Sequence, residues 1–237
     1  MRLNKFLAHC GVDSRRKCDD LIFEGRVQVD GETFTNPGAQ IDEQNSEVRV
    51  DGEIVKLKRD FTYIKLHKPQ GYVTSIKDPH NPQTVMNLLP NVLSVVPVGR
   101  LDKDTTGVLL FTDDGDLNFK LTHPKHGVEK EYEILLKHEP NGEPEKELSK
   151  GIILEDSGDR VKGIAEALNS KRTHYRIILK EGKKREVKQI FRHYGTRVHR
   201  LHRNSFAGIS ANELAPGRWK KLTRDEIEAL RAVTRNG

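Results

Sequence analysis

From residue 61 onward, short strand-like segments follow one another with few helices between them. Five segments are apolar or alternate between apolar and polar residues, namely 63–67, 92–98, 108–111, 132–136 and 174–180. Apolar residues recur at helical spacing in residues 116–121, 146–150, 185–194 and 225–232. Because a parallel sheet needs regular strand–helix alternation, this irregular order predicts an α+β domain with a mainly antiparallel sheet and flanking helices.

The first sixty residues have a different pattern, that of two helices followed by strands. Apolar residues recur at helical spacing over residues 3–10, and Ser14 is placed to cap a second helix that ends at Gly25. Residues 26–31 and 47–52 alternate like strands, and both segments end in Asp-Gly. This pattern predicts a small α/β domain.

A charged segment, residues 56–60, separates the two patterns. The chain has 237 residues, which is more than one typical domain and less than two large ones. Although 32% of the residues are charged, the strand-like runs indicate a globular protein rather than a disordered one. We therefore expect one domain over residues 1–57 and a second over residues 58–237.

The net charge of +6 is unevenly placed along the chain. Residues 2–17 hold five basic side chains and one acidic one, and residues 171–203 hold twelve basic side chains, two acidic ones and four histidines. A single basic cluster is often only a solvated surface. Two such clusters in one chain favour a nucleic acid as the partner.

The second predicted helix begins with three cations, Arg15, Arg16 and Lys17. Cations oppose the helix dipole at this end, so their position costs a little stability unless an anion binds there. A phosphate held by the helix N-terminus and these side chains would account for them. An ordinary helical hairpin with solvated basic residues is the alternative.

Cysteine content and hydropathy indicate the cellular compartment in which we expect the protein. The only two cysteines, Cys10 and Cys18, give no disulfide framework and indicate a reducing environment. Residues 1–10 lack the apolar core of a secretory signal, and no apolar run approaches the ~20 residues of a membrane span. We expect a soluble, cytoplasmic monomer that does not contact a membrane.

A carboxylate lies in the polar segment between two of the predicted strands. Residues 97–116 place Arg100 and then Asp102 after one apolar run, and residues 105–107 are predicted to turn the chain into the next. A turn between two strands is a rigid mount for a catalytic group. An acid beside an arginine in a cationic protein suggests carboxylate chemistry on a polyanion.

Metal and nucleotide sites are not expected. Asp102, Asp104 and Gly107 resemble the start of a calcium loop, but Thr106 stands where an Asp or Asn belongs and Asp113 replaces the closing Glu. Neither cysteine has a partner at zinc-ligand spacing, and no phosphate-binding glycine loop is present. The sequence predicts a protein that works without a metal or cofactor.

Tyr132 opens a predicted strand two residues after Lys130. Half-buried packing is the common role of such a tyrosine, and stacking on an extruded base is the alternative.

Residues 181–192 form a turn that leads into a helix. On this helix Val187, Ile190 and Phe191 are expected to face the core, whereas Lys184, Lys188 and Arg192 share another face. One of these cations could pair with Asp102, or the face could simply meet RNA, and the two roles are compatible.

These residues carry a resemblance to the ribosomal RNA pseudouridine synthases. Gly-Arg-Leu-Asp-Lys-Asp-Thr-Thr-Gly at 99–107 is similar to the central motif of that family. The other matching segments are Lys-Pro-Gln-Gly at 68–71, Lys-Glu-Tyr at 130–132, Glu-Gly-Lys-Lys-Arg-Glu-Val-Lys at 181–188 and residues 214–219. The segments at 2–6, 14–17 and 25–27 resemble an S4-like RNA-binding domain.

The resemblance implies an α+β enzyme that isomerises one uridine of ribosomal RNA. The N-terminal helical hairpin slightly favours the large-subunit RNA over the small-subunit RNA as the substrate. It implies that Asp102 is the catalytic residue. Arg100, Tyr132 and Lys188 would bind the substrate, and many relatives carry arginine where Lys188 stands. Other functions compatible with the same fold are a non-catalytic RNA-binding or ribosome-assembly protein and a base-removing glycosylase.

For the first domain, the resemblance implies RNA binding by five cations. These are Arg2, Lys5, Arg15, Arg16 and Lys17.

Overall fold

The computed structural model describes residues 1–91, 94–155 and 157–234. The chain divides into two compact units, Met1–Phe61 and Thr62–Gly237, and each unit has its own apolar core. The boundary expected after residue 57 lies in the segment that joins the units. No helix of the described ranges has the length and apolar content needed to cross a bilayer.

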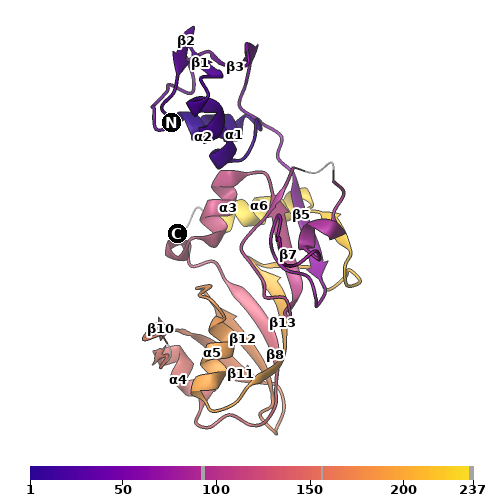
Figure 1. The fold of residues 1–237 in the computed structure, drawn as a ribbon. Coiled ribbons are helices and arrows are strands. Elements are labelled where there is room, and N and C mark those ends of the chain that lie inside the picture. The colour runs from indigo at the N-terminus through magenta and orange to yellow at the C-terminus, as the bar shows by residue number, and fades with distance from the viewer. Residues whose placement is uncertain (92–93, 156, 235–237) are drawn as a thin grey trace. The chain divides into compact units, whose positions relative to one another are not determined.

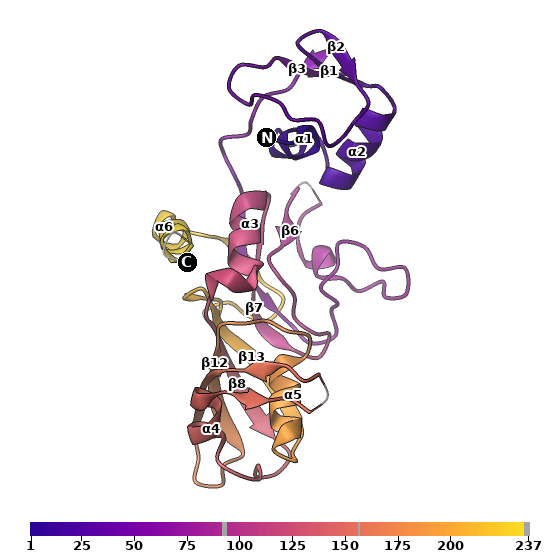
Figure 2. The same ribbon diagram turned by 90° about the vertical axis from the view of Figure 1, so that its left-hand side faces the viewer.

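In the first unit, two helices pack beside a small sheet (Figures 1 and 2). The helices are α1 (Leu3–His9) and α2 (Arg15–Phe23), and the Ser14 hydroxyl caps α2 by accepting a hydrogen bond from the Lys17 backbone amide. The sheet has the order β2 (Glu32–Phe34), β1 (Val27–Val29), β3 (Val48–Val50) and β4 (Glu53–Ile54). Both predicted helices and the two predicted strands are therefore present.

The second unit is built on a nine-stranded sheet. Its main path has the order β11 (Gly163–Ala167), β12 (His174–Leu179), β8 (Lys130–Leu136), β13 (Val198–Phe206), β7 (Thr106–Thr112), β5 (Tyr63–Lys68) and β15 (Trp219–Lys221). Strand β6 (Val96–Pro97) pairs with β7, and β14 (Ile209–Ser210) pairs with β13. Every pair except β7–β13 is antiparallel, which confirms the predicted α+β class.

Four helices flank the sheet. Helices α3 (Gly115–Thr122) and α6 (Arg224–Val233) lie at the end that holds β5 and β7, and α4 (Pro144–Lys150) and α5 (Glu186–His193) lie at the end that holds β8, β11 and β12 (Figures 1 and 2). Two short 3-10 helices, η1 (Val85–Leu88) and η2 (Pro124–His126), and a two-stranded ribbon of β9 (Ile152–Ile153) and β10 (Arg160–Val161) complete the unit.

The parallel pair β7–β13 requires a glycine at one position. At Gly107 the backbone φ is +107°, and a Cβ atom built there would lie 2.2 Å from the Arg203 carbonyl oxygen. No side chain fits so close to another backbone, so Gly107 allows the two strands to meet. Strand β7 begins at Thr106, so the turn predicted at residues 105–107 ends two residues earlier than expected.

Several elements differ from the sequence-based expectations. Of the strand predicted over 92–98, only Val96–Pro97 is a strand, and residues 92–93 lie outside the described residues. Helix α5 begins at Glu186, so Lys184 precedes the helix and does not share its face with Lys188. Strands β2, β4, β9, β10, β11, β13, β14 and β15 were not predicted. Six of these have only two or three residues, and β13 carries several basic residues and therefore resembles a solvated segment more than a central strand.

Candidate active site

The loop that carries Asp102 is held by a buried lysine. Lys68 ends β5 and is fully buried, and its Nζ donates to the carbonyl oxygens of Thr105 at 2.8 Å, Asp102 at 3.0 Å and Pro69 at 3.1 Å. Burial lowers the pKa of Lys68 to about 8, although Asp104 and Asp102 act in the opposite direction. The ammonium thus fixes the backbone on both sides of the acidic residues.

A second contact braces the same loop from residues 71–74. The Thr74 hydroxyl donates to the Leu101 carbonyl at 2.8 Å, and the Leu101 amide lies 3.2 Å from the same hydroxyl oxygen. The Gly71 amide donates to the Lys103 carbonyl at 2.8 Å. Asp102 is therefore mounted on backbone whose polar groups are already paired, as a preorganised catalytic group requires.

One cation from α5 joins two aspartates. Lys188 Nζ lies 2.9 Å from Asp102 Oδ2 and 2.7 Å from Asp104 Oδ1, and Arg185 Nε lies 3.9 Å from the same Asp102 oxygen. Burial lowers the pKa of Lys188, but the bonds to Asp104 and Asp102 outweigh burial and raise it. Burial also raises the pKa of Asp104, and the bond from Lys188 outweighs that effect and lowers it.

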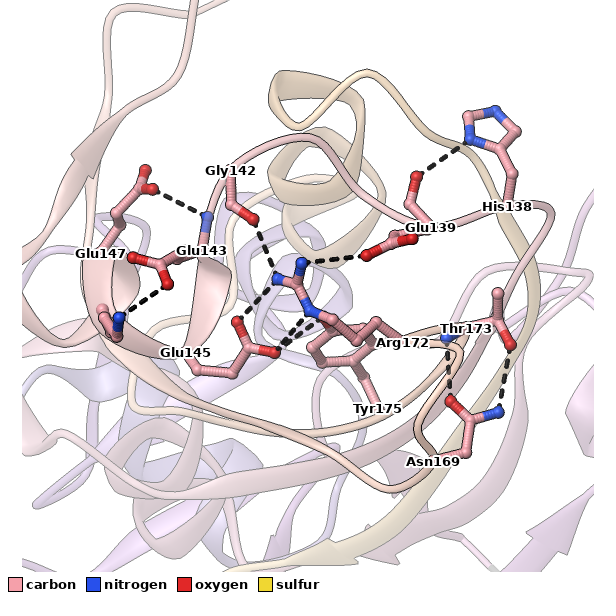
Figure 3. A network of polar contacts seen from close by, with 11 residues as sticks. His138, Glu139, Gly142, Glu143, Glu145, Glu147, Asn169, Arg172, Thr173 and Tyr175 are labelled. Atoms are coloured by element: carbon pink, nitrogen blue, oxygen red, sulfur yellow. Dashed lines mark hydrogen bonds and ion pairs between the residues drawn. The ribbon is translucent and has the colours of Figure 1, made fainter.

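A polar network around Arg172 joins residues 139–145 to the segment that leads into β12, and its Tyr175 also contacts α5 (Figure 3). Arg172 donates to Glu145 at 3.0 Å, to Glu139 at 3.2 Å and to the Gly142 carbonyl at 2.9 Å. The Tyr175 hydroxyl donates to Glu145 at 2.9 Å, and the Tyr175 ring packs on Phe191 of α5 with 5.3 Å between ring centroids. This chain of contacts positions the helix that presents Lys188 to Asp102.

A narrow cavity of about 130 Å³ opens beside the Asp102 carboxylate. Asp102, Arg100 and Lys188 line it together with Tyr132, which is 9% exposed. A cavity of about 150 Å³ holds one benzene ring, so this one has the size of a single small ring. Three elements, the loop before β7, strand β8 and helix α5, thus bring the four predicted substrate-site residues to one cavity.

Five charged residues that the sequence reasoning did not assign also line this cavity, namely Lys130, Lys183, Arg185, Glu186 and Arg203. Arg203 is 2% exposed, and its Nε donates to the Val108 carbonyl at 2.9 Å. Glu186 is 4% exposed, and burial raises its pKa to about 7. Lys130 Nζ donates to the Val128 carbonyl at 2.8 Å, and burial and the nearby Arg203 charge lower its pKa to about 8.

A wider hollow of about 640 Å³ is also lined by this loop. Arg100, Asp102 and Arg185 line both hollows, and Lys103 adds a further cation to the wider one. The same loop therefore lines both a narrow cavity and a wider, open groove. A chain of phosphates could follow such a groove while one base enters the cavity.

The five cations expected to bind RNA in the first unit lie in or beside α1 and α2. Arg2 precedes α1 and Lys5 lies within it, and Arg15, Arg16 and Lys17 form the first turn of α2. Lys17 pairs with Asp13 at 2.9 Å, and Arg15 donates to the Asn4 side chain at 3.3 Å. Both contacts are exposed, so neither prevents these cations from meeting a phosphate.

No group of three histidine, cysteine, aspartate or glutamate side chains within residues 1–91, 94–155 and 157–234 is arranged to hold a metal ion.

Two protein families match the chain, and each match lies within one of the two units. The profile of the family described as RNA pseudouridylate synthase matches residues 62–193, and that of the S4 domain matches residues 1–46. The ribosomal large subunit pseudouridine synthase B of Bacillus subtilis (strain 168) is 35% identical, and the match covers 100% of this chain and 98% of the relative. The ribosomal small subunit pseudouridine synthase A of Escherichia coli (strain K12) is 36% identical, with 97% and 100% covered.

One solved structure agrees over the whole chain. The crystal structure described as that of a pseudouridylate synthase is 30% identical, and it superposes with a TM-score of 0.70 over 97% of this chain and 99% of that one.

Proposed function

Because the chain belongs to the RNA pseudouridylate synthase family, we propose that it isomerises one uridine of ribosomal RNA to pseudouridine, with Asp102 as the catalytic residue. The observation that carries this proposal is the Asp102 carboxylate at the side of a cavity that fits one ring. Relatives of nearly the same length are named for the large and for the small ribosomal subunit. We retain the slight preference for the large-subunit RNA.

The reaction breaks the bond from ribose C1′ to uracil N1, turns the base and joins C1′ to C5. The C5 proton leaves and N1 gains a proton, so the isomerisation needs no net redox change. In this proposal Asp102 reacts with the ribose or the ring as nucleophile or base. Lys188 holds the carboxylate in place and balances its charge at 2.9 Å.

Base flipping indicates roles for the remaining two residues, Tyr132 and Arg100. A uridine that enters the narrow cavity must leave its stack in the RNA. Tyr132 lines that cavity and would contact the base, and the exposed Arg100 lies between cavity and groove, where it would fill the space that the base leaves. A cation is suited to that position because it lies next to phosphates.

For the first unit we propose a second contact with the RNA, through Arg2, Lys5, Arg15, Arg16 and Lys17. The basic residues gather on a helical hairpin, and the S4 domain profile matches this part of the chain. The proposed division of labour is RNA binding by residues 1–57 and catalysis by residues 58–237. An enzyme of this kind would act in the cytoplasm, where ribosomal RNA is assembled.

The test is incubation with unmodified small- and large-subunit ribosomal RNA, followed by chemical mapping of pseudouridine. We expect one uridine to be converted by the full-length protein and none by the Asp102→Asn variant. Binding without conversion would favour the non-catalytic RNA-binding alternative. An abasic site in place of an isomer would favour the glycosylase.

A further inference from the structure

The cavity beside Asp102 holds two buried charged groups that are only partly paired. Among the described residues, neither Arg203 Nη2 nor Glu186 Oε1 has a hydrogen-bond partner, although both side chains are more than nine-tenths buried. Buried polar atoms without partners cost free energy, and a ligand that pairs with them removes this cost. The second oxygen of Glu186 is already occupied, since it accepts from the Lys183 amide at 3.2 Å.

Lys130 adds a second donor next to Arg203. The Lys130 Nζ lies 5.6 Å from the Phe206 ring centroid and the Arg203 guanidinium carbon lies 4.9 Å from it, so the two cations share one aromatic ring. Lys130 Nζ has three N–H donors, and within the described part of the chain it makes one hydrogen bond, to the Val128 carbonyl. The residues that line the cavity therefore include donors on Arg203 and Lys130 and an acceptor on Glu186, and a small side-chain movement would bring the two unpartnered atoms to a ligand.

We propose that Arg203, Lys130 and Glu186 recognise the base by its Watson–Crick edge and determine the specificity for uracil. A uracil edge presents an N3–H donor between two carbonyl oxygens. Glu186 Oε1 accepts from N3–H, and the two cations donate to the carbonyl oxygens. Cytosine presents an acceptor at N3 and an amino donor at C4. Its N3 would therefore face the Glu186 acceptor, and its amino group would face a cationic donor, so both positions would be mismatched.

This assignment rests on the proposed function, and it also agrees with the geometry of the isomerisation. Turning uracil so that C5 takes the place of N1 is a rotation about the axis through N3 and C6. The rotation exchanges the two carbonyl oxygens but leaves N3–H where it was. A single acceptor for N3–H can therefore hold the base before and after the rotation.

The experiment uses uridine and cytidine 5′-monophosphates as probes and measures their affinity for the full-length protein by ligand-observed NMR. Above pH 7, where Glu186 is mainly ionised, we expect the wild type to bind UMP about tenfold more tightly than CMP, as one charged hydrogen bond allows. Glu186→Gln should reduce that ratio to below about threefold, because an amide can donate to cytosine N3 as well as accept from uracil N3–H. Lys130→Met keeps the aliphatic stem and should also reduce the ratio.

Glu129→Gln is the matched control, because Glu129 is exposed, pairs with Lys180 and does not line the cavity. It should leave the ratio unchanged. No UMP binding, equal affinities in the wild type, or a ratio that Glu186→Gln and Lys130→Met both leave intact would overturn the assignment. Selective UMP binding by a protein that converts no ribosomal uridine would instead refute the proposed function and leave the recognition of uracil standing.

Discussion

Two aspartates two residues apart share the Lys188 ammonium, yet only one of them lines the narrow cavity. Asp102 lines both hollows, whereas Asp104 lines the wider groove alone. The exposed position of Asp104 suits it to a supporting role, because it holds Lys188 at 2.7 Å without reaching the base. Because of this difference in position, separate substitutions of Asp102 and Asp104 can distinguish the roles of the two carboxylates.

Replacing Asp102 with Asn should abolish conversion of uridine, because an amide is neither a useful nucleophile nor a base at neutral pH. Affinity for RNA should be kept or rise slightly, since a negative charge is removed beside a polyanion. Asp104→Asn is the matched control and should retain turnover, because Lys188 still pairs with Asp102. Single-turnover mapping and filter binding measure the two effects. Measurable conversion by the Asp102→Asn protein would contradict the proposed role.

The buried Glu186 makes the free energy of unfolding depend on pH. Its pKa is raised from 4.5 to about 7 in the folded protein. The stability that the protonated side chain contributes is therefore fully present below pH 4.5 and is lost as the pH rises through 7. A shift of this size corresponds to on the order of 3 kcal/mol. Urea unfolding should therefore show the free energy of unfolding of Glu186→Gln rising relative to that of the wild type as the pH increases from 4.5 to 7. Above pH 7 the difference between the two proteins should stay constant. A difference that does not change with pH would show that Glu186 titrates normally.

At the scale of the elements, the parallel pair β7–β13 depends on one residue. Gly107→Ala places a Cβ against the Arg203 backbone and also strains a positive φ, so it should destabilise the protein by roughly 3 kcal/mol or more. Gly208→Ala has a similar φ of +78° but open space around the new Cβ, so it should cost only about 1–2 kcal/mol. Chemical denaturation measures both. Equal losses would mean that the close approach of the strands contributes nothing.

Local sequence patterns predicted most elements, and what they missed has a physical explanation. Helix α5 was recognisable because Val187, Ile190 and Phe191 repeat at helical spacing and are buried. Strand β13 was not recognisable, because an arginine such as Arg203 is expected at the surface and the sequence alone does not show that it faces inward. The partners of Lys68 and Glu186 were equally out of reach, since they depend on contacts between segments far apart in the chain.

At the scale of the whole molecule, the two units have separate cores, so the second should fold without the first. A protein that lacks residues 1–61 should retain the Asp102 site but bind RNA more weakly. It should also lose affinity less steeply with salt, because fewer cations displace counterions from the RNA. Binding titrations of the full-length and shortened proteins from 50 to 200 mM salt, a range over which such contacts weaken strongly, measure the two slopes. Equal slopes would refute a phosphate contact in the first unit.

The two sides of the active site lie far apart along the chain. Lys68, Asp102 and Tyr132 all precede residue 140, whereas Lys188 and Arg203 follow residue 180. During synthesis the chain leaves the ribosome from its N-terminus, so the Asp102 loop emerges well before the strand and helix that complete the cavity. The ion partner of Asp102 and the β13 edge of the cavity are therefore added last. A nascent chain can present its first unit to nearby RNA before the cavity is complete, and catalysis can begin only after residues up to Arg203 have emerged.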